Sequence, residues 1–148
     1  MIDTLPNDFL ASEETLDRFM DRFFDHSLPK AEWNHAGHVA MAAYVLYDSD
    51  VEAALPKLRE AIRAFIEASG GKNTASSGYH ETLTVFWLKV VAAKMRELQA
   101  ASRLDAVRGV VAAYGEARRL HTLYYSHDLH AADTVARRQW VEPDLRPI

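Results

Sequence analysis

The sequence predicts an all-α protein, a single-domain bundle of about five to six helices around a buried central helix. Apolar residues recur at helical spacing in most segments, and no segment reads as a convincing strand. Residues 39–47 have no polar group except two tyrosine hydroxyls. A helix that is apolar on all sides belongs in the middle of a domain. We therefore expect the other helices to pack around this segment.

The length and composition fit one globular domain. The chain has 148 residues, of which 49% are apolar and 26% are charged. A chain of this size can bury one hydrophobic core, and its charged fraction suits an ordinary soluble surface. We find no internal repeat and no linker, so we predict a single helical domain over residues 1–148.

Charge and cysteine content exclude several classes of function. The formal net charge is −4, whereas a protein that binds nucleic acid needs a basic face. The absence of cysteine excludes disulfides, thiolate nucleophiles and cysteine-ligated zinc. The N-terminus lacks the pattern of a signal peptide, and no apolar run is long enough to span a membrane. We expect a cytoplasmic, bacterial-type protein with neither nucleic acid nor membrane as its partner.

The first two helices are predicted on either side of a short break. Ser12 can cap a first helix from about Glu13 to His26, whose apolar residues have helical spacing. The tripeptide Ser27-Leu28-Pro29 ends it. The central helix is then expected from near Ala31 to Tyr47.

The third and fourth helices are predicted on either side of a polar loop. Asp50 can cap the third helix, which should kink or restart at Pro56 because proline lacks a backbone donor. Gly70-Gly71 ends this helix. Ser77 can cap the fourth helix, which is expected from about Tyr79 to Ala100.

The last third of the chain is predicted to be less regular. Ser102 can cap a fifth helix, whose apolar positions extend from Leu104 to Tyr114. The pattern resumes over residues 120–125. Asp133 can cap a last short helix that ends at Trp140, and an irregular tail with two prolines follows.

Seven histidines is a high number for this length, and three of them suit a metal site. His35 and His38 are one turn apart at the start of the central helix, so one rigid element would supply two nitrogen ligands. His80 shares the spacing of the apolar face of the fourth helix and should point inward. Three histidines leave open positions for water or substrate, as a catalytic metal site requires. Neutral imidazole suits zinc, iron, nickel or copper.

Glu32 and Glu81 are the candidate catalytic residues beside these histidines. Glu32 precedes His35 by three residues, which places it close to the same helical face. Either glutamate could be a general base, a further ligand or a group that orients a ligand. A di-iron site would need a second Glu-x-x-His motif and two more glutamates, and the sequence has only one such motif. Histidines near helix starts also often bind only backbone or water, so a metal-free role stays open.

The polar loop before the fourth helix is a candidate substrate-binding segment. Asn73 and Tyr79 offer hydrogen-bonding groups next to a helix N-terminus, where free backbone donors favour an anion. A plain helix cap, with Gly78 easing a turn, explains the same residues equally well.

Arginines and aromatic residues occur together near the C-terminus. Arg137 or Arg138 could bind an anion through two hydrogen bonds, and Arg137 is our third candidate substrate-binding residue. More often such arginines cover apolar surface, and the tail then packs Trp140 and Leu145 over the end of the bundle. The histidines of this region are expected to be exposed: His121, His127 and His130.

Three motifs occur together in this chain: Glu32-Trp33-x-His35-x-x-His38, Asn73-Thr74-x-x-x-Gly78-Tyr79-His80-Glu81-Thr82 and Trp140-Val141-Glu142-Pro143-Asp144-Leu145. As a set they resemble an uncharacterised family of small bacterial helical proteins, mostly described as hypothetical. The similarity spans roughly Leu28 to the C-terminus. It implies that the three segments form one site, and it implies no particular reaction. Asn34 stands where threonine is expected.

The leading hypothesis is a small metalloenzyme that acts on a small polar metabolite. A divalent transition metal would be held by His35, His38 and His80, and the reaction would be hydrolysis or an iron-dependent oxidation. The alternative is a metal-free binding protein for an anionic small molecule. A third hypothesis is an interaction protein that forms a homodimer through an aromatic face with Phe19 and Phe23.

Overall fold

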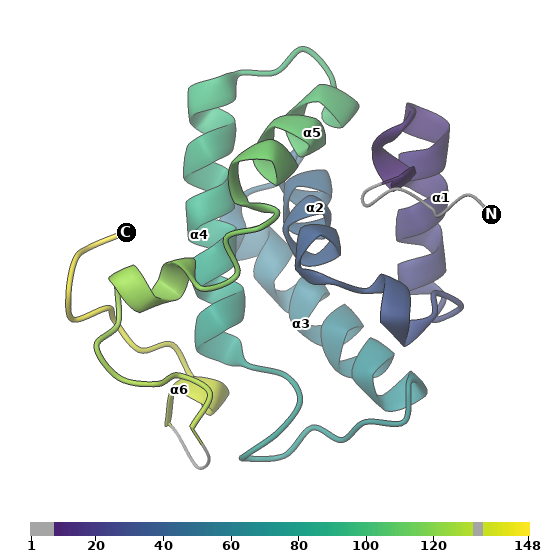
Figure 1. The fold of residues 1–148 in the computed structure, drawn as a ribbon. Coiled ribbons are helices and arrows are strands. Elements are labelled where there is room, and N and C mark those ends of the chain that lie inside the picture. The colour runs from purple at the N-terminus through teal and green to yellow at the C-terminus, as the bar shows by residue number, and fades with distance from the viewer. Residues whose placement is uncertain (1–7, 132–134) are drawn as a thin grey trace.

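The computed structural model describes residues 8–131 and 135–148. Within these ranges the chain forms helices joined by turns and loops, without a strand (Figure 1). The α-helices are α1 (Glu13–Phe24), α2 (His35–Leu46), α3 (Val51–Ala68), α4 (Glu81–Leu98), α5 (Arg103–Tyr114) and α6 (Val135–Arg138). Short 3₁₀ helices are η1 (Asp8–Leu10), η2 (Lys30–Glu32) and η3 (Leu120–Leu123). The prediction of an all-α bundle is confirmed.

Helix α2 lies in the middle of the bundle, as predicted (Figure 1). Nine of its twelve residues are buried, and it packs against α3, α4 and α5. From Val39 to Leu46 its side chains are apolar apart from one tyrosine hydroxyl, so this part of the helix favours burial. No helix within the described residues combines the length and the apolar character that a membrane span needs.

The aromatic side chains of α1 belong to the core. Phe23 is fully buried and stacks on Trp33 with ring centroids 4.1 Å apart, while Phe65 of α3 lies 5.0 Å from Phe23. Phe19 is also buried and stacks on Phe9 at 4.0 Å. Phe19 and Phe23, the candidate dimer face, are therefore turned inward. The homodimer itself stays a prediction.

Four α-helices begin at a serine, asparagine or aspartate side chain that accepts a hydrogen bond from the third helical residue. These N-caps are Ser12, Asn34, Asp50 and Ser102. The three predicted caps among them are confirmed. Asn34 explains why the central helix begins at residue 35, later than predicted.

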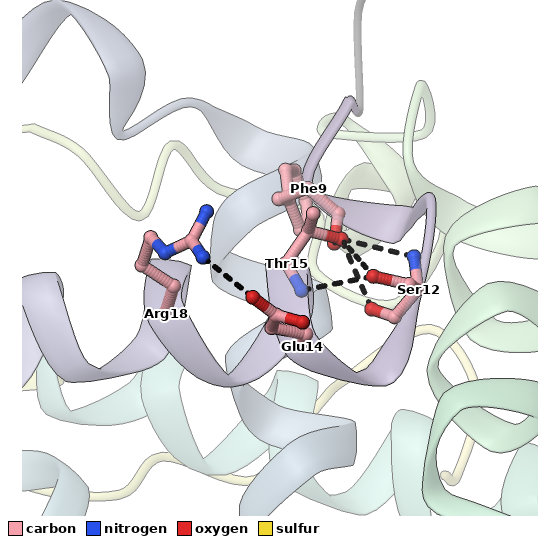
Figure 2. A network of polar contacts seen from close by, with 5 residues as sticks. All are labelled: Phe9, Ser12, Glu14, Thr15 and Arg18. Carbon is pink, nitrogen blue, oxygen red and sulfur yellow. Dashed lines mark hydrogen bonds and ion pairs between the residues drawn. The ribbon is translucent and has the colours of Figure 1, made fainter.

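Figure 2 shows how the first of these caps is built. The Ser12 amide donates to Thr15 Oγ1 at 2.9 Å, and the Thr15 amide donates to Ser12 Oγ at 3.1 Å. The Thr15 hydroxyl also bonds to the carbonyl of Phe9 at 2.9 Å. Arg18 and Glu14 form an exposed pair on the next turn. These reciprocal bonds hold the start of α1 against the chain that precedes it.

Helix α3 is continuous from Val51 to Ala68, so it does not restart at Pro56, and the alternative that it kinks there stays a prediction. Pro56 lies early in the helix, where its missing N–H removes only the bond to the carbonyl of Glu52. The helix ends before Gly70, which has a φ of +90°. The predicted glycine end is confirmed.

Helix α4 begins at Glu81, and its N-cap is His80 instead of the predicted Ser77. His80 Nδ1 accepts the amide of Leu83 at 3.2 Å. The Ser77 hydroxyl lies within the preceding loop, where it donates to the carbonyl of Lys72.

The C-terminal third packs on the outer side of α4 around a second, smaller core, which includes Phe86, Tyr125 and Leu129. Residues 120–123 form η3 instead of continuing α5. The predicted cap Asp133 lies outside the described residues, and α6 ends at Arg138, two residues before the predicted end.

Candidate functional site

A cavity of about 510 Å³ lies between α2, α3 and α4. The loop before α4 and the residues after α5 complete its wall. This volume falls in the range of roughly 300–1,000 Å³ that is usual for small-molecule sites. Most of the lining is aromatic or aliphatic, from residues such as Trp33, Met41, Leu58, Ile62, Leu83 and Trp87. Its histidines are His35, His38, His80, His121 and His130.

The three histidines singled out as metal ligands all line this cavity, and they differ in their hydrogen bonds. His80 is 7% exposed, and its Nε2 lies 2.6 Å from the carbonyl oxygen of Leu129. Because a carbonyl only accepts, Nε2 carries the proton, and Nδ1 is free to accept the amide of Leu83. Burial lowers the pKa of His80 to about 4, and the charge of Arg137 adds to this effect. Both nitrogens of this neutral ring are therefore bound to backbone.

His35 has one backbone partner. Its Nε2 lies 3.1 Å from the carbonyl oxygen of Tyr114, and the ring meets Trp87 edge-on at 4.8 Å. Burial lowers the pKa of His35, and the positive charge of Arg118 contributes in the same direction. His35 thus links the start of α2 to the end of α5.

His38 makes no hydrogen bond to any of the described residues through either ring nitrogen. Its ring lies 4.5 Å from that of Trp33. Burial, with a smaller effect of His35, lowers the pKa of His38 to about 4. At neutral pH this residue therefore gives the cavity one unused donor and one unused acceptor.

His121 is a cavity residue that sequence reasoning missed. It is only 8% exposed, so the prediction that it faces solvent is wrong. The turn η3 places its ring against Phe86, at 6.5 Å between centroids, and 5.7 Å from His130. His127 and His130 are exposed, as predicted. A signal was present, because His121 precedes the buried Tyr125 by one helical turn.

Among the described residues, no group of three or more histidine, aspartate or glutamate side chains could hold a metal ion. Three-histidine ligation would require His80 to give up one of its two backbone bonds, and His35 would have to bind the metal through Nδ1 because its Nε2 bonds to Tyr114. The residues as they lie do not fit such a metal, and the metal itself stays a prediction.

Glu81 is held in a network beside the cavity and is not part of its lining. Arg59 of α3 donates to both carboxylate oxygens of Glu81, at 2.9 and 2.7 Å. The hydroxyl of Tyr79, which lines the cavity, donates to Glu81 at 2.8 Å. The Arg59 contact is the main reason that the pKa of Glu81 is lowered. This carboxylate is therefore suited to positioning Tyr79, with its oxygens already occupied.

Glu32 lies away from the cavity. It belongs to η2, and its exposed carboxylate is 3.6 Å from Arg22. The prediction that it shares a helical face with His35 is wrong, because Asn34 caps α2 and separates the two residues.

Asn73 and Arg137 hold the loop before α4 in place. Asn73 Oδ1 accepts the amide of Tyr79 at 2.9 Å, and its Nδ2 donates to Glu67 at 2.9 Å. Arg137 donates to the carbonyl of Gly78 at 2.8 Å. Neither side chain lines the cavity, so both support the loop instead of reaching the cavity.

Thr82 connects the second motif to the third. Its hydroxyl donates to the carbonyl of Gln139 at 2.8 Å and accepts the amide of Val141 at 3.1 Å. Residues of the first motif (32–38) and of the second motif (73–82) line the cavity. The third motif (140–145) does not line it and is joined to the start of α4 through Thr82.

Arg118 is the one arginine, and no lysine, aspartate or glutamate occurs, among the described residues that line the cavity. It is exposed, and it forms no ion pair or side-chain hydrogen bond with the described residues. The cavity therefore has a largely apolar wall, several imidazoles and a single guanidinium group.

Comparisons of the chain with protein-family models, curated proteins and solved structures find no match. The structure is that of a small all-α protein with a cavity that is open to solvent, and the function is inferred from that cavity.

Proposed function

We propose that this protein binds a small organic molecule in the cavity between α2, α3 and α4, without a metal ion. The proposal depends on one observation above all: His38 offers an unused donor and acceptor within a largely apolar cavity. His38 is half-buried, so its nitrogens lose contact with water when a molecule fills the cavity. A polar group that is buried without a partner costs about 1–3 kcal/mol, so a molecule that bonds to His38 is favoured over one that does not. Apolar walls with a few placed polar groups are typical of small-molecule sites.

The hydrogen bonds of the neighbouring histidines support a site without metal. His80 caps α4 and binds Leu129, and His35 binds Tyr114. These contacts build the wall of the cavity. Recruiting His80 Nδ1 for a metal would remove the cap of α4, which is worth about 1 kcal/mol, and recruiting its Nε2 would remove the bond to Leu129.

Ligand binding can be measured by thermal unfolding of the untagged protein with aromatic and aliphatic acids and their amides. We expect at least one compound to raise the melting temperature, and the shift to be the same with EDTA. Replacing His38 by Phe should remove most of the shift, whereas His127→Phe, at an exposed histidine outside the cavity, should preserve it. Stabilisation by no compound, or a shift that EDTA abolishes, would contradict the proposal.

The metalloenzyme hypothesis remains the second candidate because His35, His38 and His80 line one cavity. Elemental analysis separates the two candidates. About one equivalent of a transition metal per chain would favour the metalloenzyme. Less than about a tenth of an equivalent, with none taken up on addition, would end that hypothesis.

A further inference from the structure

We infer that the ligand of this cavity is an amphipathic organic monoanion, with an apolar body inside the cavity and one anionic group at Arg118. This inference rests on the proposed function and adds the chemical class of the ligand. It follows from the distribution of charge in the lining.

Arg118 provides the attraction for an anion. Four arginines among the described residues form ion pairs with carboxylates, as Arg59 does with Glu81 and Arg103 with Asp48. Arg118 has no such partner among the described residues, although it lines the cavity. A guanidinium group binds a carboxylate through two parallel hydrogen bonds, so it suits a ligand that ends in such a group.

The rest of the lining restricts the ligand to one charge. Neither a lysine nor a carboxylate is found among the described lining residues. A second negative charge on a ligand would enter a largely apolar space without a partner, which is unfavourable. A cationic ligand would find no carboxylate and would be repelled by Arg118. Sugar phosphates and dicarboxylates are therefore poor candidates.

The inner part of the cavity determines the body of the ligand. Met41, Leu58, Ile62 and Leu83 provide aliphatic contacts, and His38 lies on the same wall as Met41, one turn before it on α2. An apolar body therefore gains contact area, while a single polar group on it can bond to the imidazole of His38. A fully hydroxylated molecule would leave most of its polar groups without partners.

Paired probes that differ only in their head group test this inference by calorimetry. Phenylacetate and hexanoate are compared with phenylacetamide and hexanamide, and phenyl phosphate serves as the dianion. We expect at least one acid to bind about tenfold more tightly than its amide, the gain expected from a charge-assisted pair. Phenyl phosphate should bind more weakly than that acid.

Two neighbouring arginines give a matched pair of variants. Arg118→Gln should weaken binding of the acid about tenfold and leave the amide unchanged. Arg119→Gln removes the same charge from the next residue, which does not line the cavity. This variant should bind the acid and the amide as tightly as the unmodified protein does.

The outcomes distinguish a failure of the monoanion inference from a failure of the proposed binding function. Amides that bind as tightly as their acids, or an equal loss in both arginine variants, would overturn the monoanion inference and leave the binding site standing. If no acid and no amide binds, the proposed function fails as well.

Discussion

At the scale of single residues, two histidines in one cavity have opposite hydrogen-bonding states. His80 has a backbone partner on each ring nitrogen, whereas His38 has none among the described residues. The ring of His80 is thereby fixed in one tautomer, and the ring of His38 is free to form hydrogen bonds to a ligand. Histidine thus serves as a structural cap at one position, and in the proposed function it would contact a ligand at the other.

The buried state of His80 makes stability depend on pH. Burial lowers its pKa to about 4 from the ordinary 6.5. Between these values the unfolded chain binds a proton that the folded protein excludes. Stability is therefore highest above about pH 6.5 and falls as the pH decreases toward 4. We expect the free energy of unfolding, measured in urea, to fall by about 1 kcal/mol or more between pH 7 and pH 5.

The variant His80→Asn is the matched test of this pH dependence. Asparagine can still cap α4, although it cannot titrate and loses the bond to Leu129. We expect the variant to have a lower free energy of unfolding at pH 7 than the original protein, and to lose less of it between pH 7 and pH 5. An unchanged slope in this variant would show that His80 is not a source of the effect.

At the scale of elements, the loop before α4 shapes one wall of the cavity. Gly78 has a φ of +83°, and a Cβ there would lie 2.4 Å from the carbonyl oxygen of Lys72 and 2.7 Å from Asn73 Oδ1. The same asparagine accepts the amide of Tyr79, a cavity residue. Any change at Gly78 should therefore disturb both the loop and the cavity.

Alanine substitutions at Gly70 and Gly78 distinguish the cost of a positive φ from the cost of a steric clash. Gly70 has a similar φ of +90°, but a Cβ at this position would meet no atom within 4 Å. We expect Gly70→Ala to lower the free energy of unfolding by about 1 kcal/mol, and Gly78→Ala by about 2 kcal/mol or more. Urea denaturation measures both values. Equal losses of unfolding free energy would mean that the atoms around residue 78 move to make room for the added Cβ, so that the clash has no cost.

Helix starts with local signals could be predicted from the sequence. Ser12, Asp50 and Ser102 each cap a helix as expected, because the cap and its target lie three residues apart. The cap at His80 could not be predicted in this way. Its ring is oriented by Leu129, which is 49 residues away in the chain.

At the scale of the whole molecule, the fold follows from local sequence patterns, whereas the candidate site depends on contacts between distant segments. The apolar run of the central helix and the helical spacing around it sufficed to predict a bundle. The cavity depends on contacts between distant segments, including Arg137 with Gly78 and Thr82 with Val141. Sequence spacing placed His35, His38 and His80 near one another, yet it could not assign the partners of their nitrogens. His121 was missed because its burial depends on packing against Phe86.

The most direct test of the central claim is a titration followed by nuclear magnetic resonance of the imidazole side chains. Spectra of ¹⁵N-labelled protein with EDTA would be recorded at pH 7 with increasing phenylacetate. We expect the ring signals of His38 to shift in a saturable way, and those of the exposed His127 to stay in place. Saturable binding that leaves His38 unmoved, or no saturable shift at any cavity histidine, would contradict a ligand site in this cavity.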